Sequence, residues 1–467
     1  MSSSISALSS LTDALASSGS SSSSTTSGTG LGQGINVQQF VQYAVADQQA
    51  NITALQTQQT TLGSQTGELS TISTDLTNLD NAVEALNDPL GALAAEGATS
   101  SNSSVVSATA ASTATPGSHS ITVNSLATTS SYYTNALSSS SSTISPGSFQ
   151  IQVGSNSPVT VTVNSSDNTL SQLAASINNQ NIGVTASVIQ DANGYRLALV
   201  SNSSGAPGDI TVSGNTGTGL NFTKAVTGSN ASLVVDGIPI SSASNTVSNV
   251  INGVTLNLGS AAPNTTVAVN VTPDTSQATT AINNFVSAWN TLITEINGQF
   301  NVAADGSGGG ALEADNTLQQ AQSMLLSAIS YSVLGNNGMV NLASIGVNMN
   351  DDGTLTVDNG ALSSALASNF SAVQNLMQNA TSGFAQNMDS VIQTINAPNT
   401  GILSLDSQSI TNTSQGLTQQ ISDLQAALAT QEANLTTVYS QVNATLQELP
   451  LLESQISQQI SSITSTS

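Results

Sequence analysis

The chain has 467 residues, of which 38% are hydrophobic and only 6% are charged, and its formal net charge is −24. Arg196 and Lys224 are its two basic residues, so binding to nucleic acid or to an anionic membrane surface is excluded. The chain contains no cysteine, which excludes disulfides and cysteine-based zinc sites. No apolar run is long enough for a membrane-spanning helix, so membrane insertion is not expected.

The opening residues, MSSSISALSSLTDALASSGS, have neither a basic segment nor a long apolar segment. They do not resemble a secretory signal, so we expect a cytosolic protein or export by a route that needs no such signal. The run SSGSSSSSTTSGTG at 17–30 has too few apolar side chains to form a core. We therefore expect residues 1–34 to be a disordered terminal segment.

Residues 35–88 show the periodicity of a long helix. One row of apolar residues recurs every seven positions, and a shorter second row lies three positions after it, as in a coiled coil. The first row is Leu55, Leu62, Leu69, Leu76 and Val83, and the second is Ile72, Leu79 and Leu86. Gly63 and Gly67 weaken the helix by about 1 kcal/mol each relative to alanine. Pro89 predicts its end.

Residues 96–272 change to a strand-like alternation of apolar and polar side chains, broken by Gly, Asn and Pro turns. This pattern predicts short, mainly antiparallel strands, with a single helix at 169–179. The stretch DANGYRLALV predicts a hairpin centred on Asn193-Gly194. Helical periodicity returns at 276–297, 315–330 and 361–380, with a hairpin between the last two at Asp352-Gly353.

The last segment, 408–463, repeats the seven-residue pattern and predicts a second long helix, with Pro450 expected to kink or split it. Its main row includes Ile421, Leu428, Leu435, Val442, Leu449 and Ile456, and its second row includes Leu424 and Val438. The fold class predicted is α+β and multidomain. A helical leg, bundle or coiled coil, formed by the N- and C-terminal parts carries two inserted β head domains.

The partners of the two heptad rows are left open by the sequence. The 69–86 row can pack against helices of the 276–380 region or against another copy, and packing inside a bundle is the simpler reading. For 408–463 an intermolecular coiled coil is at least as plausible, because the segment is long and terminal. All sixteen row residues named above are candidate assembly positions.

Catalytic and metal sites find little support. His119 is the single histidine and sits in PGSHSITV, an alternating strand. It is the one possible histidine base, and no motif supplies the nucleophile and carboxylate that a catalytic triad also needs. NMNDDG at 348–353 resembles the start of a calcium loop, but Asn359 stands where the loop needs a bidentate acid. A hairpin turn is the better explanation of Asp352-Gly353. We expect no enzyme, no metal and no cofactor.

Seven stretches in this order resemble the flagellar filament cap family, also called hook-associated protein 2. They span most of the chain after Gly34. They are GINVQQFVQYAVADQQANITALQTQQTTL, ATAASTATPGSHSITVNSLA, PGSFQIQVG, GVTASVIQDANGYRLALVSNSSG, LVVDGIPISSASNTVSNVINGVTLNL, AINNFVSAWNTLITEIN and IGVNMNDDGTLTVD.

The resemblance implies a division of the chain into domains. Residues 35–95 with 273–405 would form the helical leg, and 406–467 a C-terminal coiled-coil segment that pairs with 1–34 on the filament. Residues 96–130 with 229–272 would form the inner β head, and 131–228 the outer one. Both chain ends would be disordered in a lone subunit.

The resemblance also implies a function. Such proteins pass through the flagellar type III export apparatus, with a chaperone, and act outside the cell at the flagellum tip. There a small ring of copies, commonly a pentamer, contacts filament and junction proteins, retains exported flagellin and promotes its polymerisation. The family usually carries Lys and Arg in its leg helices, whereas Gln, Thr and Ser stand there in this chain.

Two other functions remain open from the sequence. One is another flagellar axial protein, at the hook–filament junction. The other is a secreted adhesin that carries its β head on a coiled-coil stalk.

Overall fold

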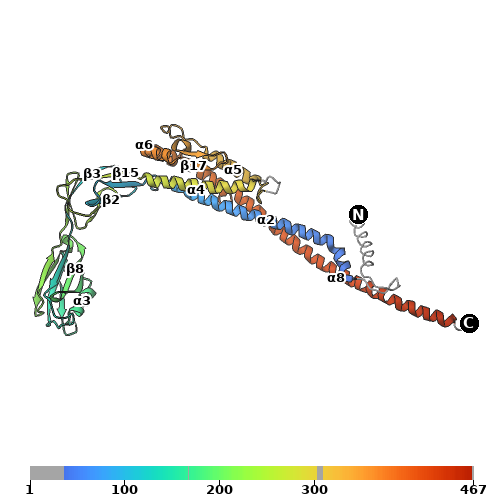
Figure 1. Ribbon diagram of the computed structural model, residues 1–467, viewed down its shortest axis with the longest axis horizontal. Coiled ribbons are helices and arrows are strands. Elements are labelled where there is room, and N and C mark those ends of the chain that lie inside the picture. The colour runs from blue at the N-terminus through green and yellow to red at the C-terminus, as the bar shows by residue number, and fades with distance from the viewer. Residues whose placement is uncertain (1–35, 167, 302–308, 465–467) are drawn as a thin grey trace.

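The computed structural model describes residues 36–166, 168–301 and 309–464. These residues form an elongated molecule with β domains at one end, a helical leg in the middle and a long helical stalk at the other end (Figure 1). The α+β multidomain class and the helical leg built from both terminal parts are thereby confirmed. The expected disordered segment 1–34 lies outside the described residues.

Six long helices build the leg and the stalk, and polar side chains cap most of their N-termini. Asn36, Asp274, Asp315 and Asp358 each accept a hydrogen bond from a backbone N–H in the first helical turn. The helices are α2 (Val37–Asn87), α4 (Thr275–Phe300), α5 (Asn316–Ile329), α6 (Asn359–Gln378), α7 (Phe384–Asn396) and α8 (Ile402–Thr464).

The leg core forms where α2, α4, α5, α6, α7 and the start of α8 bury their apolar faces together. Trp289 of α4 is fully buried there, and its indole N–H donates to the carbonyl of Gly353 at 2.8 Å. This bond ties α4 to the hairpin of β16 (Val347–Met349) and β17 (Leu355–Val357), which follows the short 3₁₀ turn Leu342–Ile345. The predicted Asp352-Gly353 turn is confirmed.

The inner head consists of two antiparallel sheets that enclose one apolar core. The five-stranded sheet has the order β1-β15-β3-β11-β12 and the three-stranded sheet β13-β14-β2. Their bounds are β1 (Glu96–Ser100), β2 (Val106–Ala110), β3 (Gly117–Ser125), β11 (Ala231–Val235), β12 (Ile238–Ser242), β13 (Thr246–Ile251), β14 (Val254–Leu258) and β15 (Val267–Pro273).

The outer head is inserted between β3 and β11 and has its own core around Phe149. A four-stranded sheet, β10-β4-β8-β7, and a three-stranded sheet, β6-β5-β9, are joined by helix α3 and the 3₁₀ turn Ala206–Gly208. Their bounds are β4 (Thr129–Thr134), β5 (Gly147–Val153), β6 (Val159–Val163), α3 (Leu170–Asn179), β7 (Val184–Asp191), β8 (Gly194–Ser204), β9 (Ile210–Thr216) and β10 (Phe222–Val226).

Five details differ from the sequence expectations. The hairpin after Asp191 turns one residue earlier, because Asp191 pairs with Gly194 and its carboxylate accepts the N–H of Asn193 at 2.8 Å. Helix α7 was not expected, although the spacing of its buried residues Phe384, Met388, Ile392 and Ile395 is helical. Helix α8 starts at Ile402, before the expected 408. Residues 406–464 are helical, not disordered.

The fifth difference is that α8 is not split at Pro450, which lies inside the continuous helix. A proline frees the carbonyl four residues earlier, here that of Leu446. Most side chains of this part of α8 are exposed, so water can bind the freed carbonyl. Gly63 and Gly67 likewise leave α2 uninterrupted.

Candidate functional site

The stalk is an antiparallel pair formed by the first half of α2 and the middle of α8. Its small core consists of Val45, Ile52, Ile421 and Leu428, with Leu55 and Leu435 partly buried at its margins. Three cross-helix contacts fix the register. They also show that the pair is antiparallel, because the residue number falls along α8 as it rises along α2. They are the ring contact Phe40–Tyr439 at 5.9 Å, and the hydrogen bonds of Gln48 with Gln431 at 3.5 Å and Gln59 with Thr418 at 2.6 Å.

The structure divides the sixteen candidate assembly positions into three groups. The first six are buried in the leg core, each at most 2% exposed, and contact helices of the same chain. They are Leu69, Ile72, Leu76, Leu79, Val83 and Leu86. Between the two alternatives for this row, the structure places it inside the leg bundle, so these side chains are not available to a second copy.

The second group lies along the stalk. Ile421 and Leu428 are buried against α2, while Leu55, Leu62 and Leu435 are half-buried. Leu424, on the second row, is 38% exposed. Along the stalk the first α8 row packs against α2. The second row lies at the margin of this contact, because Gln431 still bonds to Gln48 of α2 while Leu424 is exposed.

The third group begins at the Phe40–Tyr439 contact and continues where α8 runs past the start of α2 (Figure 1). Val438, Val442, Leu449 and Ile456 are 44–51% exposed there. Leu451, Leu452 and Ile460 are exposed as well. Leu452 continues the second row of the sequence pattern, and Leu452, Ile456 and Ile460 are spaced four apart. We call Val438, Val442, Leu449, Leu452, Ile456 and Ile460 the α8 stripe. Burial of such side chains stabilises a contact by about 1.5–3 kcal/mol each, so exposure of the stripe favours a partner.

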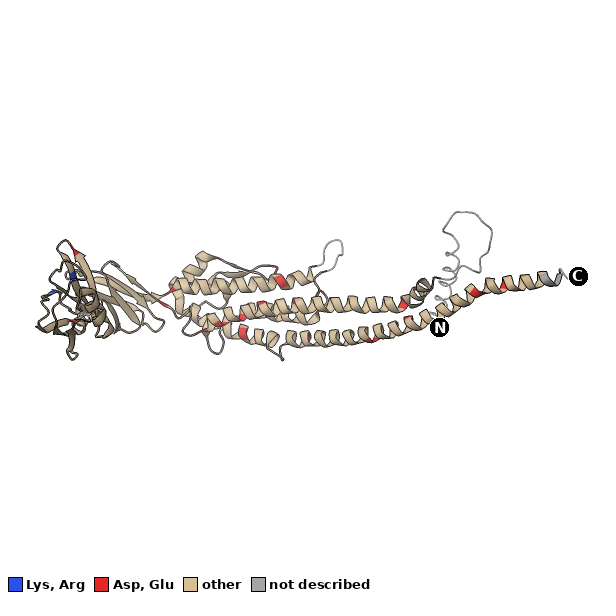
Figure 2. Ribbon diagram, turned by 90° about the horizontal axis from the view of Figure 1, so that it is seen from below, with Lys and Arg blue, Asp and Glu red and all other residues tan. Residues whose placement is uncertain are grey.

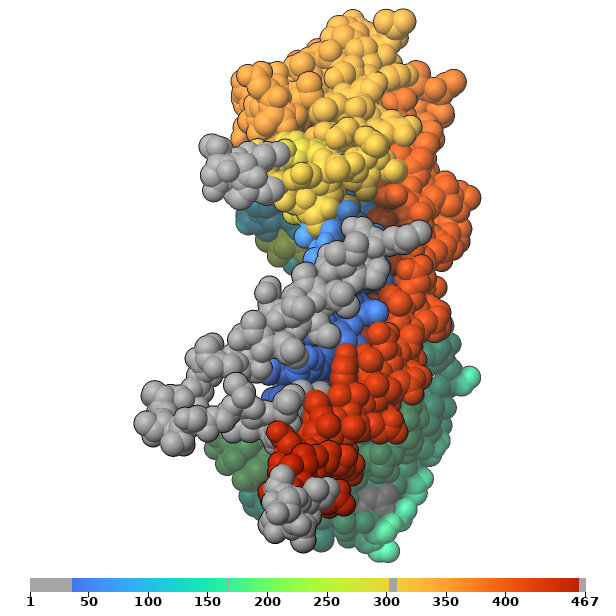
Figure 3. All heavy atoms as spheres, turned by 90° about the vertical axis from the view of Figure 1, so that its right-hand side faces the viewer, coloured from blue at the N-terminus to red at the C-terminus, as the bar shows by residue number. Residues whose placement is uncertain are grey.

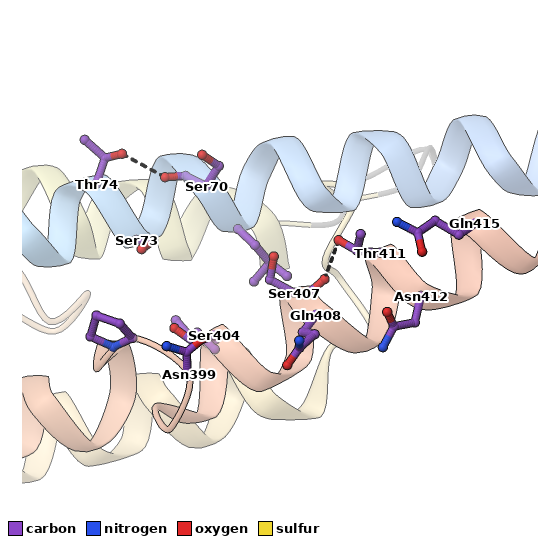
Figure 4. A pocket seen from close by; sticks show the side chains of 13 residues that line it. Ser70, Ser73, Thr74, Asn399, Ser404, Ser407, Gln408, Thr411, Asn412 and Gln415 are labelled. Carbon is purple, nitrogen blue, oxygen red and sulfur yellow. Dashed lines mark hydrogen bonds between the residues drawn. The ribbon is translucent and has the colours of Figure 1, made fainter.

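A polar groove lies between α2 and the start of α8, at the junction of stalk and leg. It has a volume of roughly 660 Å³, and its floor includes Leu69 and Leu403. Hydroxyl and carboxamide side chains line it, and none of the thirteen lining residues is ionisable (Figure 4). Within it, Thr74 and Thr411 each donate to a backbone carbonyl one turn earlier on their own helix. The groove thus offers uncharged contacts, polar along its sides and apolar at Leu69 and Leu403.

The charges are distributed unevenly along the molecule. Both basic residues lie in the outer head, whereas acidic residues extend along the leg and stalk (Figure 2). Each base is paired: Arg196 Nε lies 2.6 Å from Asp191 and Lys224 Nζ 2.7 Å from Asp209. Each also lies over a tyrosine ring, Arg196 over Tyr133 and Lys224 over Tyr132. These pairs leave the outer head without a free basic side chain.

His119 lies in the inner head and is paired with a carboxylate. Its Nδ1 lies 2.8 Å from Asp236 Oδ2, and the Ser120 N–H donates to Asp236 Oδ1 at 2.7 Å. The hydrogen bond from His119, followed by that from Ser120, lowers the pKa of Asp236. Asp236 lies in the tight turn between β11 and β12, with φ +50°. Because its carboxylate bonds to His119 and Ser120, it fixes that turn to β3.

Carboxyl groups meet one another across the leg helices. Desolvation by burial, reinforced by Asp389 and Glu84, raises the pKa of Asp80 to about 6. Desolvation, reinforced by Asp315, raises the pKa of Asp406 to about 6. Among the described residues no three His, Asp or Glu side chains converge as a metal site, and no described helix has the length and hydropathy needed to cross a membrane.

Seen along its long axis, the molecule presents α8 with the start of α2 beside it (Figure 3). Fold and site together define an elongated structural protein, with β domains at one end and an apolar-striped helix at the other.

Comparison with known proteins identifies the family. Family models described as the C-terminus and N-terminus of flagellar hook-associated protein 2 match residues 228–450 and 33–130, and the flagellin hook IN motif matches 148–203. The B-type flagellar hook-associated protein 2 of Pseudomonas aeruginosa is 30% identical over 87% of this chain and 90% of its own. The flagellar hook-associated protein 2 of Escherichia coli K12 is 27% identical over 92% of this chain and 97% of its own.

Solved structures agree with the sequence comparison. The crystal structure of the D1-D2-D3 domains of the Escherichia coli flagellar cap protein covers 74% of this chain and 99% of its own, with a TM-score of 0.57 and 29% identity. The chain therefore belongs to the flagellar hook-associated protein 2 family.

Proposed function

We propose that this protein caps the distal end of the bacterial flagellar filament. In this role a ring of copies retains exported flagellin and promotes its folding and insertion at the growing tip. Membership of the hook-associated protein 2 family supports the assignment. The observation that carries it is the α8 stripe, an apolar helix face that projects from the leg, at the opposite end of the molecule from the β heads.

The stripe gives the stalk a role in attachment. An amphipathic helix binds a complementary surface through residues spaced three, four and seven apart. Because the stalk has no basic residues, we expect its contacts to rest mainly on apolar packing. We propose that the α8 stripe, and not the buried 69–86 row, contacts the filament.

We propose the following domains for the cap subunit. The leg comprises 35–95 and 273–405, the inner head 96–130 and 229–272, and the outer head 131–228, with 1–34 and 406–467 as terminal segments. Three separate hydrophobic cores support the leg, the inner head and the outer head as domains. The fourth cluster joins α2 to α8, so the stalk combines part of the leg segment with 406–467.

We also propose that the protein acts outside the cell at the flagellum tip and reaches it unfolded through the flagellar export apparatus, with a chaperone. The absence of cysteine suits a chain that must stay unfolded without forming wrong disulfides.

Removal of the gene tests the function. Cells without this protein should release monomeric flagellin into the medium and bear short filaments or none, and the full chain should restore filament growth. Normal filaments in the deleted strain would exclude the capping role.

The same strain tests the α8 stripe. We expect a chain with Val442, Leu449, Leu452 and Ile456 replaced by serine to be secreted without restoring filaments. A matched control replaces Gln441, Gln447, Gln455 and Gln458 of the same helix with alanine and should restore them. Full activity of the serine variant would refute the role of the stripe without affecting the capping proposal.

A further inference from the structure

The leg and stalk lack basic side chains, so protein cations cannot neutralise their acidic groups. The two bases and the histidine of the chain all lie between residues 96 and 272. Acidic residues on neighbouring leg helices nevertheless face one another, and in two of these places a carboxyl oxygen is buried without a hydrogen-bond partner. Each of these two joins a helix of the leg to α7 or α8.

The first pair joins α2 to α7. Asp80 of α2 lies within hydrogen-bonding reach of Asp389 of α7, and Glu84 is the other acidic group that acts on it. Gln393 bridges the two carboxyl groups, since its Nε2 lies 3.1 Å from Asp80 Oδ2 and 3.4 Å from Asp389 Oδ1. The other oxygen of Asp80, Oδ1, is buried and has no hydrogen-bond partner.

The second pair joins α8 to α5. Asp406, near the start of α8, lies within hydrogen-bonding reach of Asp315, the N-cap of α5. Asp315 Oδ1 is occupied, because it accepts the N–H groups of Thr317 at 2.8 Å and Leu318 at 2.9 Å. Asp406 Oδ2 is buried without a hydrogen-bond partner. Among the described residues, Asp315 is the charged group that acts on Asp406.

Two ionised carboxylates within hydrogen-bonding reach repel each other, and a buried oxygen without a hydrogen-bond donor lowers the stability of the fold. A single proton removes both problems, because a carboxylic acid can donate to the facing carboxylate. We propose that each pair shares one proton, and that release of these protons as the pH rises towards neutral loosens α7 and α8 from the rest of the leg.

The direction of the pH effect follows from the raised pKa values. Asp80 and Asp406 have pKa values of about 6 in the folded chain, against an ordinary value of 3.8. Below the ordinary value both folded and unfolded chains are protonated. As the pH rises towards 6 only the unfolded chain releases its protons, so the leg loses stability, and the loss is complete above 6.

A metal ion is a less suitable occupant of these pairs. Calcium takes six to eight oxygen ligands, and in the described part of the chain no three acidic or histidine side chains converge at either pair. A proton needs just the two oxygens.

Hydrogen–deuterium exchange on the full chain at pH 5.0 and 7.5 tests the proposal. After correction for the intrinsic pH dependence of exchange, peptides from 385–412 should lose protection by roughly tenfold or more at pH 7.5, because one pKa unit changes an equilibrium tenfold. The Asp80→Asn and Asp406→Asn double variant should show nearly the same protection at both pH values, since asparagine resembles the protonated acid.

Two further variants keep the result decisive. Asp389→Asn with Asp315→Asn neutralises the same pairs from the opposite side, and should remove the pH effect if the first double variant fails to fold. Asp423→Asn, at an exposed position of α8, should retain the full wild-type pH effect. The proposal would be overturned by equal wild-type protection at both pH values or by an unchanged pH effect in the neutralised variants. Recovery of protection at pH 7.5 on adding calcium would overturn it in favour of a cation site.

Discussion

The stalk core is so small that two substitutions in it should unfold the stalk while the leg stays folded. Val45, Ile52, Ile421 and Leu428 are the buried members of this cluster, and none of them belongs to the leg core. Replacing a buried Leu or Ile by alanine costs about 2–5 kcal/mol. Ile421 and Leu428 are 7% and 8% exposed and lie in a two-helix contact, so we expect values near the lower limit, about 2 kcal/mol each.

The Ile421→Ala and Leu428→Ala double variant should therefore lose about 4 kcal/mol of stalk stability. Isolated helices are marginal in water, so α2 before residue 60 and α8 after residue 417 should lose helicity by circular dichroism and protection by hydrogen exchange. The urea midpoint followed by fluorescence of Trp289, which is buried in the leg core, should change little.

Leu76→Ala is the matched control, because Leu76 is 0% exposed in the leg core. This substitution should lower the Trp289 midpoint and leave the stalk contacts intact at low urea. If the stalk variant lowered the Trp289 midpoint as much as Leu76→Ala does, stalk and leg would unfold as one unit and the separation argued above would be wrong.

Three smaller perturbations address the heads and the caps. Gly205→Ala should destabilise the heads by about 1–3 kcal/mol, because φ is +81° and the new Cβ would lie 2.6 Å from Ala243 Cα; an unchanged melting temperature would contradict this. Asp358→Ala should cost about 1 kcal/mol of leg stability in urea, since its carboxylate caps α6, and Asp358→Asn should retain most of it. Asp236 has a lowered pKa, so it stabilises the inner head above its ordinary pKa of 3.8 and the benefit is lost as the pH falls further; Asp236→Asn should reduce the acid sensitivity of inner-head exchange, and an identical acid profile would exclude this role.

The sequence predicted the elements better than their partners. Periodicity located α2, α4 and α5 within a few residues, because their buried side chains repeat at helical spacing. It could not decide what the 69–86 row packs against, since a heptad row fits a bundle and an oligomer equally well. The structure answers that question with α4, whose Trp289 and Phe285 belong to the same core.

The acidic pairs could not be predicted at all. Asp80 and Asp389, or Asp315 and Asp406, are distant in sequence, and only the packing of α7 on α2 and of α8 on α5 brings them together. The α8 stripe was partly predictable. Its heptad row was visible, but which members stay exposed depends on where α2 begins, at Val37.

Electron cryomicroscopy of filament ends tests the capping role most directly. Purified full chain would be added to filaments from the gene-deleted strain, with the serine variant of the α8 stripe as control. We predict a ring of density at the distal end alone, with helical stalks entering the filament and β heads facing outward, and none with the variant. Binding along the filament sides, at the other end or not at all would contradict the account.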